Sequence, residues 1–339
     1  MSLQEFYVEG GERATLASLK HTGKHILGAA PFYDLIMVNV GEASLGSGST
    51  GTVFHAKLQK RNVVVKLPNT LLDSKHIVLN ANGHVTTTPI TSARDRKLFE
   101  EAQSDLEIEW HNGFLLREGA EIMATGIADP AGVNINESEL RWQDKHPVGY
   151  NNIHELLGMD ASVPCLISAY FEDAVLLWAR RVKPTPHFIF HVVEPQVRAG
   201  LAYMHNSAGL AHMDIKPYNM LCSHKVSKGQ HYLHVVLCDF GATMPSDAPG
   251  QSPAGTVGYM APEVEHAGYI PKFADAYSFA VSILHLLHPS VPCETTQDQP
   301  VMLHKILARQ CPARLKAIVH EMDPAKRYAM FQSSADIYA

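Results

Sequence analysis

The 339-residue sequence is poor in cysteine, and its cysteines show no pairing pattern. There are five of them, at Cys165, Cys222, Cys238, Cys293 and Cys311. An odd number of scattered cysteines argues against a disulfide framework and against a cysteine zinc site. The 20 histidines form no HExxH motif either, so we expect most of them to be surface or packing residues. Reduced thiols predict an intracellular location, cytoplasmic or nuclear.

The sequence also lacks an excess of positive charge and any long hydrophobic run. A net charge of −6 does not attract nucleic acid or anionic membranes, whose binders carry a basic excess. The best apolar run, "FAVSILHLL" at 279–287, is far shorter than the roughly 20 residues of a membrane span. Residues 1–16 contain early acidic residues and no apolar core, which predicts no secretory signal. We therefore expect neither a nucleic-acid nor a membrane partner, and the oligomeric state stays open.

What the sequence does have is the composition of a globular protein, with 46% apolar and 18% charged residues. Its first half contains most of the strand-like patterns, at 33–40, 45–58, 62–67 and 165–171. Residues 68–93 look like an inserted hairpin or loop. Residues 94–118 have helical periodicity, with apolar side chains on one face at Leu98, Ala102, Leu106 and Leu116.

The second half is mainly helical. A loop-rich stretch at 129–163, with a short helical segment at 152–158, precedes it. From about residue 187 the apolar spacing predicts helices, interrupted by a strand at 233–241 and a turn-rich loop that runs to Pro262. Strands first and helices second predict an α+β chain with two lobes.

A glycine motif lies between the strand patterns, at Gly46, Gly48 and Gly51. A dinucleotide-binding GxGxxG precedes a helix, so this context disfavours that fold. A glycine loop between strands can instead fold over phosphates with its backbone N–H groups, and a flexible hairpin is the alternative. Lys66 ends the next strand, where its ammonium can serve a phosphate or be a strand-edge charge.

A second set of polar residues follows in the helical half. Asp214, Lys216 and Asn219 lie in a loop after a helix, and Asp239 follows the apolar run "VVL", where it can hold a divalent ion. The segment "GTVGYMAPE" comes later, at 255–263. Each feature has an ordinary alternative, but their order and spacing together indicate phosphoryl transfer.

On these motifs the sequence resembles the eukaryotic-type protein kinases over about residues 45 to 330. The matching segments are "GSGSTGTV" at 46–53, "VVVK" at 63–66, "HMDIKPYN" at 212–219, "DFG" at 239–241 and "APE" at 261–263, with Asp275 and Arg327 as later landmarks. The resemblance implies a bilobal kinase-like fold with a β-rich N-lobe, a mainly helical C-lobe and the ATP site in the cleft. It places an extension at 1–40, the N-lobe at 41–171 with an insertion at 68–93, and the C-lobe at 172–339.

The resemblance also implies the chemical roles. Asp214 would accept or orient the proton of a substrate hydroxyl, with Lys216 beside the transferring phosphate. Asn219 and Asp239 would hold Mg²⁺, with Mn²⁺ as an alternative ion. Lys66 would contact the α- and β-phosphates of ATP and pair with a helix glutamate. We favour Glu109 for this pair, with Glu107 and Glu101 as alternatives.

The predicted nucleotide pocket is formed by Gly46, Gly48, Gly51, Val53, Val64, Lys66, Ser168, Ala169 and Phe171. Val64 replaces the alanine usual above the adenine ring and should narrow the pocket. Ser168 aligns with the small residue that gates the back of the pocket. Backbone groups of 169–171 would bind adenine, with Glu172 or Asp173 near the ribose. A structural ion pair is expected between Glu263 and Arg327.

Lys216 and Thr256 resemble the serine/threonine kinases, so the expected partners are protein substrates with Ser or Thr. Met213 stands where many relatives carry an arginine that binds a phosphorylated activation loop, and the segment 239–263 has no Lys or Arg. We therefore expect activity without activation-loop phosphorylation. The alternatives are a pseudokinase scaffold and a small-molecule phosphotransferase. The form HxDIxPxN also resembles the divergent kinases of large DNA viruses.

Overall fold

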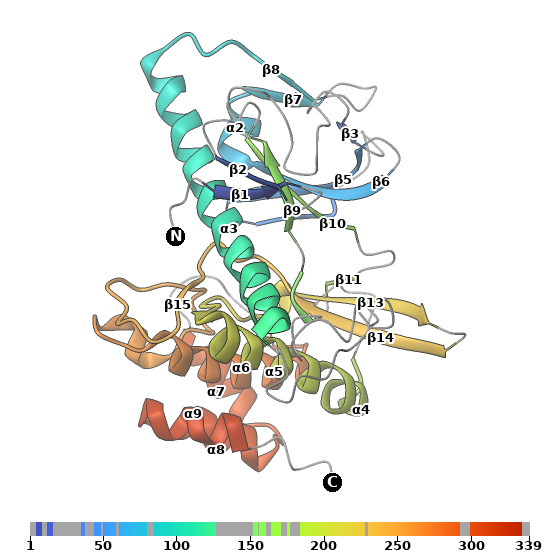
Figure 1. The fold of residues 1–339 in the computed structure, drawn as a ribbon. Helices are drawn as coiled ribbons and strands as arrows, with labels where there is room; N and C mark the ends of the chain where they lie inside the picture. The colour runs from blue at the N-terminus through green and yellow to red at the C-terminus, as the bar shows by residue number, and fades with distance from the viewer. Residues whose placement is uncertain are drawn as a thin grey trace. The chain divides into compact units, whose positions relative to one another are not determined.

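The computed structural model of the chain (Figure 1) describes residues 5–8, 12–15, 35–37, 44–48, 50–58, 61–79, 85–126, 152–154, 156–160, 164–170, 175–176, 184–227, 230–291 and 299–333. The chain divides into two compact units. The first unit consists of Met1–Leu115 and Glu155–Phe171, and the second of Leu116–His154 and Glu172–Ala339. The lobe boundaries expected at residues 40 and 171 stay predictions.

The first unit contains a six-stranded sheet in the order β3-β5-β6-β10-β9, with β4 added to β5. All its pairings are antiparallel. Its strands are β3 (Leu35–Met37), β4 (Gly46–Ser47), β5 (Gly51–Leu58), β6 (Arg61–Pro68), β9 (Leu156–Asp160) and β10 (Cys165–Ala169). The strands expected from the sequence at 45–58, 62–67 and 165–171 are present, and β3 lies within the one expected at 33–40.

The helical segment expected at 152–158 is wrong, because β9 occupies Leu156–Asp160. β9 pairs with β10 from Leu156 opposite Ser168 to Asp160 opposite Cys165. Ladder hydrogen bonds to a buried neighbouring strand outweigh a weak local helix preference, which Gly158 lowers further.

The insertion at 68–93 forms a short helix and a hairpin. Helix α2 (Asn69–Asp73) is followed by β7 (Ile77–Leu79), which pairs with β8 (Val85–Thr87). Leu71 is fully buried and Ile77 is 2% exposed, and both belong to the apolar core of this unit. One face of the insertion is therefore part of the core.

Helix α3 (Ala93–Gly126) begins where the sequence predicted a helix and continues beyond residue 118. Ala102 joins the sheet residues Val65, Leu67 and Ile167 in the core, so α3 packs against the sheet of the first unit (Figure 1). Strands β1 (Glu5–Val8) and β2 (Glu12–Thr15) pair with each other in a separate ladder.

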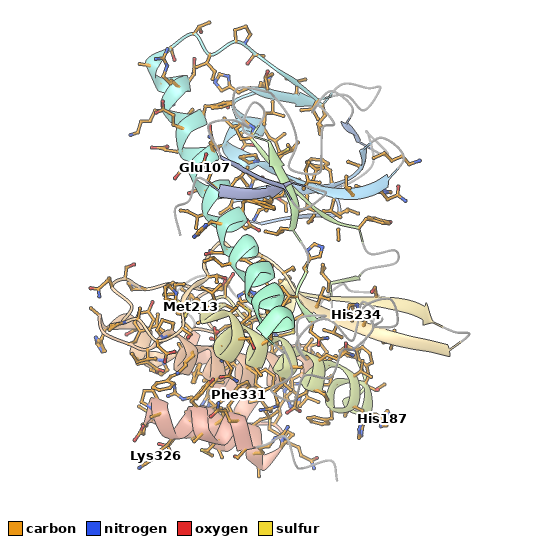
Figure 2. The ribbon with its side chains drawn as sticks, viewed as in Figure 1. Glu107, His187, Met213, His234, Lys326 and Phe331 are labelled. Carbon is orange, nitrogen blue, oxygen red and sulfur yellow. The ribbon has the colours of Figure 1, made fainter. Side chains whose placement is uncertain are left out.

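The second unit is mainly helical. Its helices are α4 (Pro186–Phe188), α5 (Glu194–Tyr203), α6 (Pro271–Leu287), α7 (Gln299–Leu307), α8 (Ala313–His320) and α9 (Pro324–Ser333), with π-helical turns at Ile189–Val193 and Met204–Ala208. The apolar run at 279–287 lies in α6, most of which is buried. Phe331 of α9 is labelled in Figure 2. Phe279 of α6 meets its ring edge-on, with ring centroids 5.1 Å apart. Within the parts of the chain described, no helix is both long and apolar enough to cross a membrane.

Short strands in the second unit fix the loops that carry polar residues. β13 (Met220–Ser227) pairs with β14 (Gln230–Leu237) and with β11 (Val175–Leu176). β12 (Leu210–Ala211) pairs with β15 (Met244–Pro245). The first hairpin holds the chain between Asn219 and Cys238, and the second ladder joins the chain before Asp214 to the chain after Asp239.

Candidate active site

The glycine loop in the first unit lies between β4 and β5. Gly46 pairs with Val53, and the N–H of Gly48 donates to the carbonyl of Gly51 over 3.0 Å. A Cβ atom at Gly51 would lie 2.9 Å from Cγ of Lys66, so the Lys66 side chain runs directly against this glycine. At Gly46 a Cβ would meet nothing within 4 Å, and at Gly48 only the Gly51 carbonyl at 3.9 Å. Packing therefore requires glycine at position 51, whereas a Cβ atom would fit at positions 46 and 48.

Lys66 forms an ion pair with Glu109 of α3. Its Nζ lies 2.7 Å from Oε2 of Glu109, and the two side chains are only 13% and 7% exposed. The other candidate glutamates are engaged elsewhere, because Glu107 accepts a hydrogen bond from Gln103 and Glu101 lies 3.5 Å from Lys97 on the exposed side of the helix. Among the three, Glu109 is the one that the structure brings to Lys66.

The residues expected around the adenine lie on adjacent strands. Val64 of β6 is directly opposite Ser168 of β10, and Val53 is opposite Lys66. Ser168 is buried at 7% exposure. Phe171, Glu172 and Asp173, which were also expected there, lie outside the described residues.

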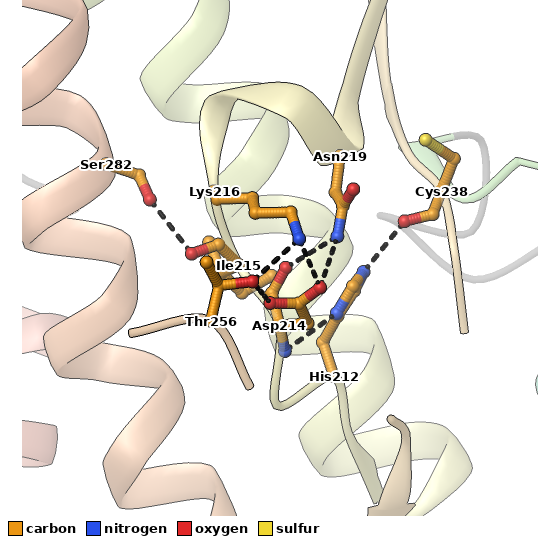
Figure 3. A network of polar contacts seen from close by, with 8 residues as sticks. All are labelled: His212, Asp214, Ile215, Lys216, Asn219, Cys238, Thr256 and Ser282. Carbon is orange, nitrogen blue, oxygen red and sulfur yellow. Dashed lines mark hydrogen bonds and ion pairs between the residues drawn. The ribbon is translucent and has the colours of Figure 1, made fainter. Parts of the chain in front are cut away.

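The Asp214 carboxylate of the second unit has three side-chain partners (Figure 3). Oδ2 accepts from Lys216 Nζ at 2.7 Å and from Asn219 Nδ2 at 3.0 Å. Oδ1 accepts from the Thr256 hydroxyl at 2.6 Å, and that hydroxyl accepts in turn from Lys216 Nζ at 2.7 Å. Four residues singled out from the sequence thus form one polar network with a fixed carboxylate at its centre.

A buried aspartate on α6 anchors the backbone before Asp214. Asp275 is fully buried and accepts from the N–H groups of His212 at 2.7 Å and Met213 at 2.8 Å. It also accepts from Nε2 of His205 at 2.9 Å. Met213 has a φ of +66°, which L-residues adopt at a cost of about 1 to 2 kcal/mol, and the two Asp275 contacts offset this cost. The sequence marked Asp275 as a landmark but gave no signal for His205.

His212 connects the two loops of the network. Its Nδ1 accepts from the N–H of Asp214 at 3.3 Å, so its proton must be on Nε2, which donates to the carbonyl of Cys238 at 3.1 Å (Figure 3). The N–H of Cys238 donates to the carbonyl of Asn219 at 3.1 Å. Both the N–H and the carbonyl of Cys238 are thus hydrogen-bonded, which holds the backbone that leads into Asp239, a residue with a φ of +68°.

Glycine at 255 allows Thr256 to reach Asp214. Gly255 has a φ of +110°, and a Cβ atom there would lie 2.5 Å from the carbonyl oxygen of Met213. The backbone of 255 therefore packs directly on the backbone that precedes Asp214. The next residue, Thr256, is brought within hydrogen-bonding distance of the carboxylate.

Two further contacts hold the segment around 255–263. Nη1 of Arg327 lies 2.6 Å from Oε1 of Glu263, and Arg327 is 1% exposed, so the expected pair is present in the structure. The Tyr259 hydroxyl donates to Nδ1 of His285 at 2.6 Å, while Nε2 of His285 donates to the carbonyl of Val291 at 2.8 Å. Burial lowers the pKa of His285 below its usual 6.5, which keeps this imidazole neutral.

Asn219 and Asp239 offer oxygen ligands of the kind that Mg²⁺ prefers. The amide nitrogen of Asn219 donates to the carbonyl and carboxylate of Asp214, so its Oδ1 points away from them (Figure 3). The described residues contain no group of three His, Cys, Asp or Glu side chains that could hold a metal ion. An amide and a single carboxylate fit an ion that is also bound by substrate phosphates.

A glycine loop against a paired lysine, together with a fixed Asp–Lys–Asn loop, fits the class of ATP-dependent phosphotransferases. A family model described as "Protein kinase domain" matches residues 165–334, half of the chain. The chain belongs to the protein kinase domain family.

Curated proteins from Arabidopsis thaliana and Xenopus laevis are similar to this chain. U-box domain-containing protein 34 of Arabidopsis thaliana is 32% identical over 161 residues, which are 45% of this chain and 20% of that protein. Wall-associated receptor kinase 2 of Arabidopsis thaliana is 27% identical over 161 residues, 41% of this chain and 20% of that protein. Mitogen-activated protein kinase kinase kinase 10 of Xenopus laevis is 28% identical over 172 residues, 47% of this chain and 17% of that protein. The chain thus spans about a fifth of the length of the curated relatives it matches.

Proposed function

We propose that the chain is an active serine/threonine protein kinase that uses ATP and Mg²⁺. The observation that carries the proposal is the Asp214 carboxylate, held by Lys216, Asn219 and Thr256. A carboxylate fixed in this way can orient the hydroxyl of a substrate and accept its proton, because a general base must lie within hydrogen-bond reach of that proton.

The hydrogen bonds of Asp214 indicate which oxygen acts. An ionised carboxylate has about four acceptor sites, two on each oxygen. Lys216 and Asn219 occupy both sites on Oδ2, and Thr256 occupies one on Oδ1. The remaining site on Oδ1 is where we place the substrate hydroxyl, and the ammonium of Lys216 then lies beside the phosphate being transferred.

The other residues serve the nucleotide. Lys66, held by Glu109, would contact the α- and β-phosphates, and the glycine loop would approach them with its backbone. Asn219 and Asp239 would hold Mg²⁺, which when bound offsets the charge of the phosphates.

Specificity for serine and threonine rests on two residues. Lys216 follows Asp214 by two positions, and its Nζ contacts both Asp214 and Thr256. Tyrosine kinases usually carry an arginine in this loop at a different spacing. The Lys216–Thr256 contact supports a protein substrate whose acceptor is an aliphatic hydroxyl.

We also propose that activity does not require phosphorylation of the segment 239–263. An acidic residue already anchors this segment, because Asp247 forms an ion pair with Lys272 and accepts from the Ser246 hydroxyl at 2.9 Å. The hydrogen bond from Lys272, and after it the one from Ser246, lowers the pKa of the Asp247 carboxyl below its usual value. The ladder between β12 and β15 further supports an ordered segment. Protein shown by mass spectrometry to be unphosphorylated should have full activity, and a requirement for prior phosphorylation would contradict the proposal.

The first test is transfer of the γ-phosphate of ATP to a generic protein substrate. Asp214→Asn should lose about 10²- to 10⁴-fold in kcat, the usual contribution of a positioned base. Asp105→Asn makes the same chemical change at an exposed position of α3 and should leave the rate unchanged. Phosphoamino-acid analysis of the product then tests the specificity. Mg²⁺-dependent ATP binding with no transfer by the wild type would instead support the pseudokinase scaffold.

A further inference from the structure

Asn69, the first residue of α2, is bonded to three residues of the glycine loop. Its side-chain Oδ1 accepts from the Thr52 hydroxyl at 2.7 Å, and its Nδ2 donates to the carbonyl of Gly48 at 2.7 Å. Its backbone N–H donates to the carbonyl of Thr50 at 3.3 Å. We call these three contacts the Asn69 bridge.

The directions of these hydrogen bonds fix the orientation of the amide. The Gly48 carbonyl can only accept, so the NH₂ group of Asn69 must face it and the amide oxygen must face Thr52. Thr52 donates its single hydroxyl proton to Asn69, so the Ser47 hydroxyl, 3.0 Å away, must donate to Thr52. An amide side chain is the group that serves both sides, since a carboxylate would turn an acceptor toward the Gly48 carbonyl.

The Asn69 bridge holds the part of the loop that the sheet does not. The ladder of β4 with β5 ends at Ser47 and Thr52, and Gly48 and Thr50 lie beyond it, in the turn. Without the bridge, the turn between these strands would have only its own Gly48–Gly51 hydrogen bond among the bonds described. Asn69 also follows Lys66 by three residues on one continuous chain, so the turn and the lysine are fixed to the same segment.

A loop that is ordered before binding loses less conformational entropy when the ligand arrives. We propose that Asn69 is a positioning residue, which pre-orders the glycine turn for the polyphosphate of a nucleoside di- or triphosphate. This inference rests on the nucleotide binding proposed for the chain. It concerns the phosphates alone, because none of the bridge contacts involves Val64 or Ser168.

Binding of Mg²⁺–ADP and of adenosine, measured by calorimetry on the full chain, tests the bridge. Asn69→Ala should weaken Mg²⁺–ADP binding about 5- to 30-fold, which corresponds to about 1 to 2 kcal/mol, the range for one or two neutral hydrogen bonds. Adenosine lacks phosphates, so its affinity should change less than twofold. In the transfer assay KM for ATP should rise while kcat stays within about threefold.

Three further variants separate positioning from folding. Ser74→Ala removes a 2.7 Å hydrogen bond to Thr70 at the other end of α2 and should leave both affinities unchanged. Thr52→Val should give an intermediate loss of ADP affinity, and Thr52→Ser, which keeps the hydroxyl, should restore it. Asn69→Asp should bind ADP no better than Asn69→Ala, because its carboxylate faces the Gly48 carbonyl and adds negative charge near the phosphates.

Selective loss of ADP affinity in Asn69→Ala, with Ser74→Ala like the wild type, would establish the inference. An equal loss for ADP and adenosine would overturn it, since Asn69 would then support the whole unit and not the phosphate loop. Unchanged ADP binding in Asn69→Ala would overturn it while the proposed function stands. Failure of the wild type to bind Mg²⁺–ADP would overturn both.

Discussion

At the scale of single residues, the Lys66–Glu109 pair shows how a charge is held where it can serve a ligand. Both side chains are largely shielded from water, so the carboxylate restricts the ammonium more strongly than an exposed partner could. The close passage of Lys66 along Gly51 restricts the side chain from the other side. The position of the ammonium is therefore determined by a helix and a glycine turn together.

Glu109→Gln should lower kcat/KM about 10- to 100-fold, because a lysine displaced by about 1 Å no longer meets the phosphates in the productive geometry. Steady-state kinetics with varied ATP measures this loss. Glu101→Gln is the matched control on the exposed side of α3 and should behave like the wild type. Similar losses in both variants would mean that helix charge, and not the pair with Lys66, is responsible.

A second residue-scale prediction concerns His285 and pH. Burial lowers its folded-state pKa below 6.5, so the folded protein keeps the imidazole neutral while the unfolded chain takes up a proton. As the pH falls from about 7.5 through 6.5, the unfolded state binds more protons than the folded state, and the free energy of unfolding decreases. The decrease ends only when the folded imidazole is also protonated.

His285→Gln retains a donor toward Val291 and cannot titrate, so its unfolding temperature should fall less than that of the wild type between pH 7.5 and 5.5. Tyr259→Phe removes the 2.6 Å hydrogen bond between Tyr259 and His285 while keeping the imidazole, so its pH dependence should match the wild type. Differential scanning fluorimetry over this pH range gives the slopes. Equal slopes for His285→Gln and the wild type would assign the pH dependence to other groups.

At the scale of secondary-structure elements, the sequence predicts the helices and strands that have a long periodic pattern of apolar residues. Helix α3 and strands β5, β6 and β10 follow from periodicity and β-branched runs. β13 was missed, because the second half of "MLCSHKVS" has little apolar alternation. Its pairing with β14, from Met220 opposite Leu237 to Ser227 opposite Gln230, supplies the stability that its own residues do not.

The contact of the segment around Gly255 with the loop before Asp214 leads to an element-scale prediction. Gly255→Ala would place a methyl group 2.5 Å from the Met213 carbonyl, and backbone cannot yield without moving Thr256 away from Asp214. We expect kcat to fall at least about tenfold, because the carboxylate loses its Thr256 contact. The transfer assay measures it.

Gly268→Ala is the matched control for this change. Gly268 also has a positive φ, +92°, but a Cβ atom there would meet nothing within 4 Å. Both variants should lose stability from backbone strain, about 1 to 2 kcal/mol, while only Gly255→Ala should lose kcat. An equal effect of the two on kcat would show that strain alone accounts for the result.

At the scale of the whole molecule, the sequence predicts the residues of the candidate site better than it predicts the residues that hold them in place. Asp214, Lys216 and Asn219 belong to one loop motif, whereas Thr256 lies 42 residues beyond Asp214, and the fold brings the four into one network. The groups that fix this network and the glycine loop, such as His205 and Asn69, give no signal in the sequence. A single buried histidine or a half-buried asparagine acquires its function only from partners that the chain brings together in space.

The stability of the whole molecule should also depend on bound nucleotide and metal, and removing either one tests this. A ligand that binds only the folded state stabilises it by about 2.7 kcal/mol at 100 times its Kd, and each tenfold loss of affinity removes about 1.4 kcal/mol. Saturating Mg²⁺–ADP should therefore raise the unfolding temperature, and EDTA should remove most of the increase. Asp239→Asn should lose the Mg²⁺-dependent part, whereas Lys66→Met should weaken binding with and without the metal. An increase that persists in EDTA, or that Asp239→Asn retains in full, would mean that Asp239 holds no ion that the nucleotide needs.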